Sequence, residues 1–251
     1  MKRTVICFIL FLNRLLAQEV DDTSKYYSFR LTIKDQTFRI EHDTLNWNAY
    51  IKRALAELKI KQFNEALSDN SKAIKIKPND CLAYFNRGVT YGKMENYAQA
   101  IIDYTKVVEL NPKYLSVYGN RAFCYRQLKD DENAFKDYGT QIEFDYESYK
   151  AYVARGWIYI ERKKFTEALN DFKKALELNP KRIDYYYNIG SAYFHLKDYT
   201  KAMEMYNKGI ELNPNDYFMY SGRGDIYKVL NQPEKAKQEF AKSEELKAKT
   251  K

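Results

Sequence analysis

Apolar and small residues recur along most of the chain at helical spacing, in pairs of short segments. In one such pair, Tyr84, Gly88 and Tyr91 share one face of a predicted first helix. Ala100 and Tyr104 share one face of a predicted second helix, and polar residues separate the two segments. The pattern therefore predicts an antiparallel pair of helices, and it returns before and after this stretch.

The pattern has a period of 34 residues with no insertion. Four of the five prolines carry it, with spacings of 34, 68 and 34 residues: Pro78, Pro112, Pro180 and Pro214. Ending each repeat two residues after its proline gives six repeats, which span residues 47–80, 81–114, 115–148, 149–182, 183–216 and 217–250. Repeat position 4 is Tyr in all six, position 20 is Ala in all six, and position 8 is always small. Such self-similarity indicates tandem copies of one helical hairpin.

Size complementarity explains why each repeat folds as a hairpin. A break near position 15 is predicted to fold the two helices antiparallel, so that position 8 lies level with position 24, and position 11 lies level with position 20. A small residue at 8 then faces an aromatic at 24, and Tyr at 11 faces Ala at 20. Pro at position 32 ends the second helix, because proline cannot donate a helical hydrogen bond. One hairpin cannot bury both of its faces, so neighbouring hairpins are expected to stack.

Charged residues form a second regularity. Position 7 is Arg in five repeats, namely Arg53, Arg87, Arg121, Arg155 and Arg223. Position 23 is acidic in the same five, namely Asp69, Asp103, Asp137, Asp171 and Glu239. Repeat 5 has Ile189 and Met205 instead. Because positions 7 and 23 are nearly level, we expect an Arg–carboxylate pair inside each of the five hairpins.

These motifs resemble the tetratricopeptide repeat family, whose 34-residue signature combines a large aromatic, a small residue, a second aromatic, Ala, a third aromatic and Pro. The resemblance covers residues 47–250. The family often has Trp at position 4 and Leu at position 7, where this chain has Tyr and mostly Arg. The resemblance implies an all-α, right-handed superhelical solenoid of six helix-turn-helix repeats. It also implies that the first helices line a concave groove.

The resemblance places repeat positions 2, 5, 6, 9, 12 and 13 in that groove. We expect peptide-binding residues there: Asn86, Asn120 and Asn188 for contacts to a peptide backbone, with Phe85, Phe123, Trp157 and Tyr187 as anchors. Other groove positions are apolar too, including Val153, Ile160 and Phe218. The alternative is that the asparagines are merely solvated and that several aromatics pack between helices.

The resulting prediction is a non-enzymatic scaffold that binds a protein or peptide in its groove. The alternative is a structural subunit of an envelope or secretion complex that docks through its convex face or through residues 18–46. The sequence has no Gly-rich phosphate loop, metal-ligand cluster or nucleophile with a nearby base, so we expect no cofactor, no metal site and no catalytic residue. The oligomeric state stays open.

The charge pattern argues against nucleic acid as the partner. The formal net charge is +8, and charges of both signs are interspersed along the chain. A nucleic-acid binder usually concentrates its Lys and Arg in one stripe. The short basic groups here are typical of a solvated surface.

The first 17 residues have the pattern of a secretory signal peptide: a basic start, a short apolar run and a small residue, Ala17, at the end. We therefore expect export, to the periplasm, the envelope or the medium, with cytoplasmic location as the alternative. The apolar run is too short to span a bilayer, so no membrane span is expected in the mature chain.

Residues 18–46 lie outside the repeats. Apolar residues alternate at Phe29, Leu31 and Ile33 and again at Phe38 and Ile40. This alternation predicts a short β-hairpin docked on repeat 1 or on a partner. A disordered leader is the alternative.

The cysteines are not spaced for a disulfide. Cys81 is at position 1 of its repeat and Cys124 at position 10 of the next. Nine helical residues separate such positions by about 13 Å along the axis, and a disulfide needs Cα atoms within about 7 Å. We expect two free thiols, with Cys124 in the core.

Overall fold

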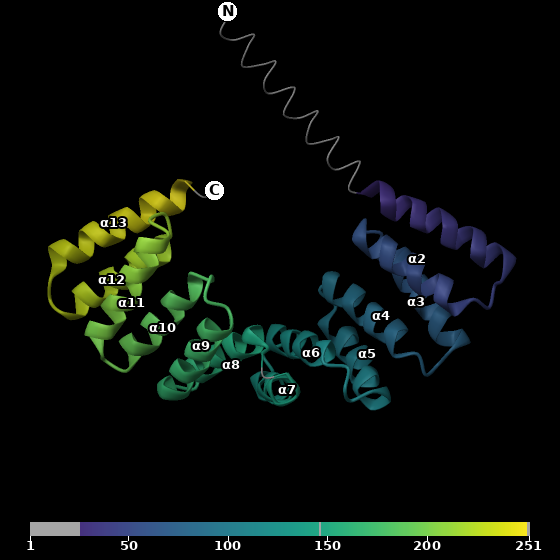
Figure 1. The fold of residues 1–251 in the computed structure, drawn as a ribbon, viewed down its shortest axis with the longest axis horizontal. Helices are drawn as coiled ribbons and strands as arrows, with labels where there is room; N and C mark the ends of the chain where they lie inside the picture. The colour runs from purple at the N-terminus through teal and green to yellow at the C-terminus, as the bar shows by residue number, and fades with distance from the viewer. Residues whose placement is uncertain (1–25, 146, 250–251) are drawn as a thin grey trace, which may run out of the picture. The chain divides into compact units, whose positions relative to one another are not determined.

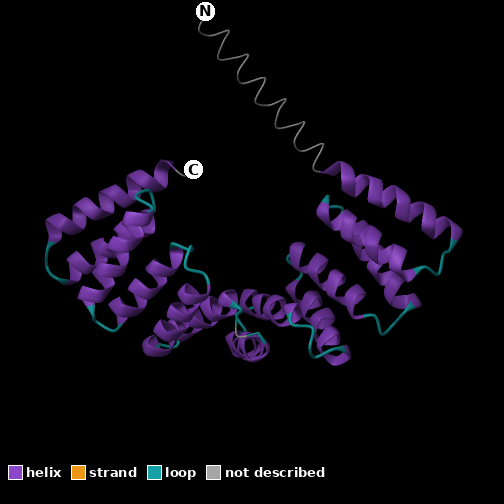
Figure 2. Cartoon of the chain, viewed as in Figure 1, coloured by secondary structure: helices purple, strands orange, loops and turns teal. Residues whose placement is uncertain are grey.

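The computed structural model describes residues 26–145 and 147–249, and within these ranges the chain consists of helices and loops without strands (Figure 2). The chain divides into two compact units, one ending at Lys129 and one beginning at Asp130. The division falls inside repeat 3. The prediction of an all-α fold built from tandem helical hairpins is confirmed.

The N-terminal unit contains one helix over residues 26–42 and then repeats 1, 2 and the first half of 3 (Figure 1). Its helices are α2 (Trp47–Lys59), α3 (Phe63–Ile76), α4 (Cys81–Lys93), α5 (Tyr97–Leu110) and α6 (Ser116–Gln127). α2 packs on α3 and α4 packs on α5, and α3 and α5 also pack on the first helix that follows.

The C-terminal unit contains the second half of repeat 3 and repeats 4 to 6 (Figure 1). Its helices are α7 (Asp131–Phe144), α8 (Tyr149–Glu161), α9 (Phe165–Leu178), α10 (Asp184–His195), α11 (Tyr199–Leu212), α12 (Tyr217–Val229) and α13 (Pro233–Lys249). The same packing order holds, and the first helices α10 and α12 also contact each other directly.

After the first helix of each of the six repeats, one residue adopts the left-handed backbone conformation. Position 15 has a positive φ, between 55° and 64°, at Lys61, Glu95, Lys129, Lys163, Lys197 and Asn231. In repeat 5 the backbone N–H of Asp198 then donates to the carbonyl of Tyr193, and the carboxylate of Asp198 accepts the N–H of Lys201 to start α11. The sequence break predicted near position 15 is therefore confirmed.

The level pairing of positions 8 and 24 is confirmed in four repeats. A Cβ built on the glycine at position 8 would lie only 2.5–2.7 Å from the ring at position 24, at Gly88–Tyr104, Gly156–Phe172, Gly190–Tyr206 and Gly224–Phe240. The glycines thus allow the two helices of a hairpin to approach until a ring fills the space between them.

The predicted Arg–carboxylate pairs are present in repeats 1, 2, 4 and 6. In repeat 2, Arg87 donates from Nε and Nη2 to both oxygens of Asp103, at 2.8 and 2.7 Å. The pairs Arg53–Asp69, Arg155–Asp171 and Arg223–Glu239 have the same two-point geometry. In repeat 5, Ile189 is buried and Met205 packs on its cluster. The two units share repeat 3, so the pair predicted there stays a prediction.

The same arginine also joins neighbouring repeats. Its Nη1 donates to position 25 of the preceding second helix, so Arg87 bonds Ser71 at 3.1 Å and Arg223 bonds Asn207 at 2.9 Å. Arg121 bonds Thr105 in the same way. One side chain therefore links three helices, a role that the sequence pattern had suggested only for two.

The β-hairpin expected within residues 18–46 is wrong, because residues 26–42 are helical. The alternation of apolar residues was misleading: Leu31 and Phe38 are exposed, whereas Gln36 and Ile40 are buried. Buried residues four apart have the helical period. The polar stretch between the two apolar runs contains no Gly, Pro or Asn that would favour a turn.

This helix docks on repeat 1, as expected for the segment. Ile40 joins a core cluster with Ala49, Tyr50 and Ile51. Arg53 donates from Nη1 to Thr37 at 3.0 Å, the bond that other repeats make to position 25 of the repeat before. Residues 26–42 therefore occupy the place of a second helix preceding repeat 1. The rest of the N-terminal segment, including the predicted signal peptide at 1–17, lies outside the described residues.

Cys81 and Cys124 are free, as predicted. Cys124 is 1% exposed, and burial raises the pKa of its thiol to about 11. Within the part of the chain that the structure describes, no helix combines the length and the apolar character needed to cross a membrane.

Candidate functional site

A pocket of about 360 Å³ lies in the C-terminal unit, on the face formed by three successive first helices. We call it the groove pocket. It is lined by Trp157 of α8, by Asp184, Tyr187 and Asn188 of α10, and by Asp216 and Phe218 at the start of α12. Equivalent faces of neighbouring hairpins thus contribute one wall each. The volume falls within the roughly 300–1,000 Å³ of typical ligand pockets.

The aromatic walls of the groove pocket are held by packing from behind. Tyr187 lies 5.5 Å from Phe218 and 5.8 Å from Tyr206, measured between ring centroids. Trp157 packs edge-on against the buried ring of Phe172, at 5.6 Å. The walls are therefore positioned before any ligand arrives.

Tyr206 is fixed from two sides. A Cβ on Gly190 or on Gly222 would lie 2.6 or 2.4 Å from its ring. The small residues at position 8 of repeat 5 and position 6 of repeat 6 thus decide where Tyr206, and through it Tyr187, can lie.

Two carboxylates line the groove pocket. Asp216 caps α12, and its Oδ1 accepts the backbone N–H of Phe218 at 3.1 Å. Asp184 accepts two bonds from Arg182, at 2.9 and 2.8 Å. Burial raises the pKa of Asp216, and the negative charge of Asp184 raises it further. The pKa of Tyr187 is raised by burial and by the nearby charges of Asp225 and Asp216.

Three of the seven predicted binding residues meet in this pocket: Trp157, Tyr187 and Asn188. Trp157 and Tyr187 are partly exposed, and Asn188 is 6% exposed at the pocket wall. Asp184 and Asp216 were not among the expected binding residues. Asp184 occupies position 2, which the resemblance places in the groove, so that position could have found it. Asp216 occupies position 34 and reaches the pocket from the start of the next first helix, α12.

The other four predicted residues belong to the N-terminal unit. Phe85 is half-buried and packs against Tyr114, 4.9 Å away. Asn86 is buried, and its Nδ2 has no hydrogen-bond partner within the described chain. On α6, Asn120 is partly exposed and Phe123 is 49% exposed. Their role as binding residues stays a prediction.

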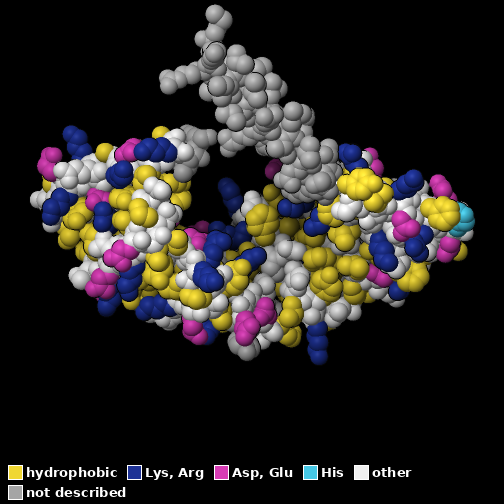
Figure 3. Space-filling model, turned by 45° about the horizontal axis from the view of Figure 1, so that its top comes forward, with side chains coloured by type: hydrophobic (Ala, Val, Ile, Leu, Met, Phe, Trp, Pro, Cys, Tyr) yellow, Lys and Arg dark blue, Asp and Glu magenta, His cyan; other side chains and the backbone are white. Residues whose placement is uncertain are grey.

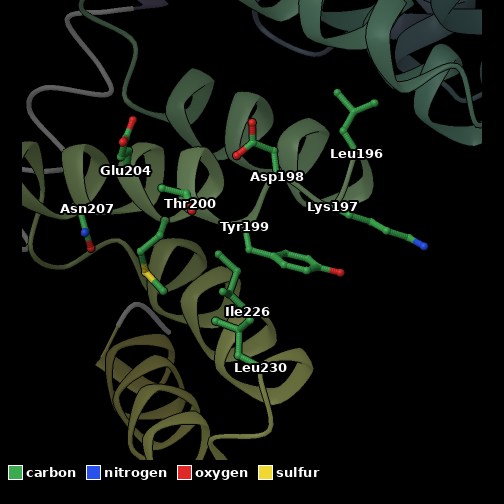
Figure 4. Close-up of a pocket in the computed structure, with 10 residues that line it drawn as sticks. Leu196, Lys197, Asp198, Tyr199, Thr200, Glu204, Asn207, Ile226 and Leu230 are labelled. Atoms are coloured by element: carbon green, nitrogen blue, oxygen red, sulfur yellow. The ribbon is translucent and has the colours of Figure 1, made fainter.

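A second, larger cavity of about 750 Å³ is lined by residues of repeats 5 and 6 (Figure 4). We call it the second-helix cavity, because α11 and the turn before it supply most of its lining, including Tyr199, Met203 and Glu204. Ile226 of α12 and Leu230, which follows the end of this helix, lie beside Tyr199 and complete an apolar floor (Figure 4).

In the visible face of the space-filling view, Lys and Arg side chains are interspersed with Asp and Glu (Figure 3). This agrees with the interspersed signs along the sequence.

Stacked antiparallel helix pairs of one length, with a pocket on the face of the first helices, define a helical-repeat protein. Models of the tetratricopeptide repeat match residues 81–114, 183–216 and 219–250, and a model described as "TPR repeat" matches residues 156–196. The chain belongs to the tetratricopeptide repeat family.

Solved structures of this family share the fold. MamA is 23% identical, with a TM-score of 0.60 over 65% of this chain and 95% of that one. YrrB, a TPR protein with an unusual peptide-binding site, is 22% identical, with a TM-score of 0.66 over 73% of this chain and 95% of that one. A tetratricopeptide repeat protein from Parabacteroides merdae ATCC 43184 is 19% identical, with a TM-score of 0.64 over 93% and 92%. No curated protein matches the chain.

Proposed function

We propose that this protein is a non-enzymatic scaffold that binds a partner peptide or protein segment on the face of its first helices, with the groove pocket as the main anchor point. Solenoids of stacked repeats present such faces for binding. YrrB, which has the same fold, is a TPR protein with a peptide-binding site. Both facts favour an interaction scaffold.

One observation carries the proposal. Trp157, Tyr187 and Asn188, which the family resemblance places in the groove, line one pocket together with Phe218 as a third aromatic wall. Aromatic side chains in a well-packed pocket are typical anchors for a partner side chain. The amide of Asn188 offers both a donor and an acceptor, which suits the backbone of an extended peptide.

Peptide display on the full chain tests the proposal. A library of random peptides is selected on the wild type, and enriched peptides are then measured on two variants. Trp157→Ala with Tyr187→Ala removes the pocket walls, whereas Leu212→Ala removes an exposed apolar side chain of α11 as the control. Circular dichroism checks that both variants fold.

The proposal predicts peptides that bind the wild type and the control and lose binding to the pocket variant. Equal binding to all three proteins, or no enrichment on the wild type, would contradict it.

The alternative function, a structural subunit that docks through its outer face, rests on the second-helix cavity. Its apolar floor, with Met203 and Leu230, offers a partner helix a place to pack. Cross-linked capture from the native source discriminates the two. A partner lost with Met203→Lys and kept with Trp157→Ala would favour this alternative over the groove pocket.

Export is a further part of the proposal, supported by the signal-like residues 1–17. The chain is expressed in secretion-competent cells, the cells are fractionated, and the N-terminus of the product is sequenced. Export predicts a product outside the cytoplasm that begins near Gln18. A cytoplasmic product that retains residues 1–17 would contradict export.

A further inference from the structure

We propose that the groove pocket takes an arginine side chain of the partner peptide, with the guanidinium held between aromatic faces and the carboxylate of Asp216. This inference rests on the proposed function and specifies the chemistry of its partner. The walls, the charge and the position of Asn188 support it independently.

The walls suit a flat cation with an apolar stem. Trp157, Tyr187 and Phe218 supply three aromatic rings around one cavity. Guanidinium groups stack on the faces of aromatic rings, because the ring quadrupole attracts the cation and the plane matches the ring. An ammonium group would gain the charge attraction without the stacking, so the pocket favours Arg over Lys.

The negative charge of Asp216 at the pocket would attract a cation. Asp216 uses Oδ1 to cap α12, and within the described residues it forms no ion pair. The neighbouring charge that acts on it is another carboxylate, Asp184. An arginine from the partner would meet a partly desolvated carboxylate that the chain itself leaves without a counter-charge.

Asp184 differs from Asp216 because it already has a cationic partner within the chain. Both of its oxygens are occupied by Arg182, so its charge is already balanced within the chain. The pair borders the pocket and adds a polar edge beside the aromatic walls. We therefore assign the ligand contact to Asp216 and not to Asp184.

Asn188 lies where it can hold the peptide that carries the arginine. It contributes to the same pocket from one turn further along α10 than Asp184. With the side chain in the pocket, the amide of Asn188 can bond the adjacent peptide group. An extended segment with one arginine is thus the smallest ligand that uses all the polar groups.

A fluorescence titration tests the arginine preference. The chain has two tryptophans, so Trp47→Phe leaves Trp157 in the pocket as the only one. In this background the full chain is titrated with capped pentapeptides, Ac-Ala-Ala-X-Ala-Ala-NH2, where X is arginine, lysine, citrulline, leucine or glutamate. Citrulline keeps the shape of arginine and removes its charge.

Two carboxylate variants complete the design. Asp216→Asn removes the pocket charge and keeps a good helix cap, since Asn and Asp cap equally well. Asp80→Asn makes the same change at the same repeat position in the N-terminal unit, where Asp80 caps α4. Circular dichroism confirms folding of both.

We expect the arginine peptide to bind about tenfold more tightly than the citrulline or leucine peptide, the ratio typical of one charge-assisted hydrogen bond. Asp216→Asn is expected to remove most of this ratio, and Asp80→Asn none of it. Equal binding of leucine and arginine, stronger binding of glutamate, or no response of Trp157 to arginine would overturn the inference.

Failure of this inference is distinct from failure of the proposed function. If displayed peptides bind the groove pocket and carry no arginine, the scaffold function stands and the arginine preference falls. If no peptide depends on Trp157 and Tyr187, the proposed function itself falls.

Discussion

Repeats 2 and 5 present the same residue types at the same two groove positions and build different surfaces from them. Repeat 2 has Phe85 followed by Asn86, and repeat 5 has Tyr187 followed by Asn188. In repeat 5 the aromatic walls a pocket that also contains Asp216. In repeat 2 the position of Asp216 is occupied by Tyr114, whose ring packs on Phe85.

A neighbouring residue outside the repeat signature therefore decides what each face can bind. Tyr114 covers Phe85 with another apolar ring, whereas Asp216 brings a carboxylate beside Tyr187. Position 2 differs in the same way, because it is the apolar Leu82 in repeat 2 and the acidic Asp184 in repeat 5. The signature fixes where the side chains lie, and positions 2 and 34 set their chemistry.

The two repeats also differ in how their hairpins are held together. Repeat 2 uses the Arg87–Asp103 pair, in which Asp103 is 2% exposed, and repeat 5 uses Ile189 and Met205. A buried ion pair and a packed apolar pair can have similar net stability, because desolvation offsets much of the attraction. Either the ion pair or the apolar pair can hold the first and second helices of a hairpin side by side.

The largest predicted effect follows from breaking the pair in repeat 2. Arg87→Met leaves the carboxylate of Asp103 buried without its partner, which costs about 3–5 kcal/mol. Urea unfolding followed by circular dichroism measures the loss. Hydrogen exchange should localise it to α4 and α5.

The matched control installs the residues of repeat 5. Arg87→Ile combined with Asp103→Met should recover most of the stability lost in Arg87→Met, because no charge remains buried. A double variant as unstable as Arg87→Met, or a single variant with no loss, would contradict this view of the pair.

The next largest effect concerns the ring that supports the pocket. Gly190→Ala places a Cβ against Tyr206, and Gly222 already confines that ring from its other side. We expect a loss of about 1–3 kcal/mol, typical of overpacking. The measurement is the urea midpoint, with Gly88→Ala in repeat 2 beside it.

Gly88→Ala should cost less than Gly190→Ala. The residue that corresponds to Gly222 after repeat 2 is Asn120. Only Gly88 closely approaches Tyr104 among the described glycines, because a Cβ on Gly92 would lie 3.9 Å from that residue, whereas two glycines closely approach Tyr206. Equal losses in the two variants would show that the second glycine does not confine the ring.

A smaller effect, of opposite sign, is expected at the turns. Lys197 and Glu95 occupy left-handed turns with φ of 63° and 60°. Replacing either by Gly relieves a strain of about 1 kcal/mol, and the two repeats should gain equally. Denaturant unfolding of Lys197→Gly and Glu95→Gly checks this. A loss of stability in either variant would mean that the lysine or glutamate side chain contributes more than the turn strain costs.

The smallest predicted effect is the cost of the pocket charge. Because the pKa of Asp216 is raised in the folded protein, its ionisation disfavours folding as pH rises through that pKa. Asp216→Asn should therefore be slightly more stable than the wild type at pH 7 and equal to it in acid. Unfolding midpoints at both pH values measure the difference. Asp80→Asn is the control. A loss of stability in Asp216→Asn at pH 7 would contradict the predicted direction of the change.

The repeat signature was enough to predict the hairpins, the turn at position 15 and the Arg–carboxylate pairs, because each depends on spacing within one 34-residue unit. The helix over residues 26–42 was missed, because it has a single copy and its exposed Leu31 and Phe38 imitate strand alternation. The bond that its Thr37 accepts from Arg53 obeys the repeat rule, although the sequence of this helix does not.

The site was predictable in part for the same reason. Trp157, Tyr187 and Asn188 follow from groove positions within single repeats. Asp216 reaches the pocket only because the loop before α12 lies beside α10, which is a contact between repeats. A single sequence does not specify how neighbouring repeats share a wall.

Photo-cross-linking of an arginine pentapeptide tests the central claim most directly. The peptide carries a photoreactive group next to its arginine, and tryptic mass spectrometry locates the adducts on the full chain. The account predicts adducts in α8, α10 and α12, competed away by the unlabelled arginine peptide and lost in Asp216→Asn. Adducts mainly at Phe85 and Tyr114 of repeat 2, or in the second-helix cavity, would contradict it.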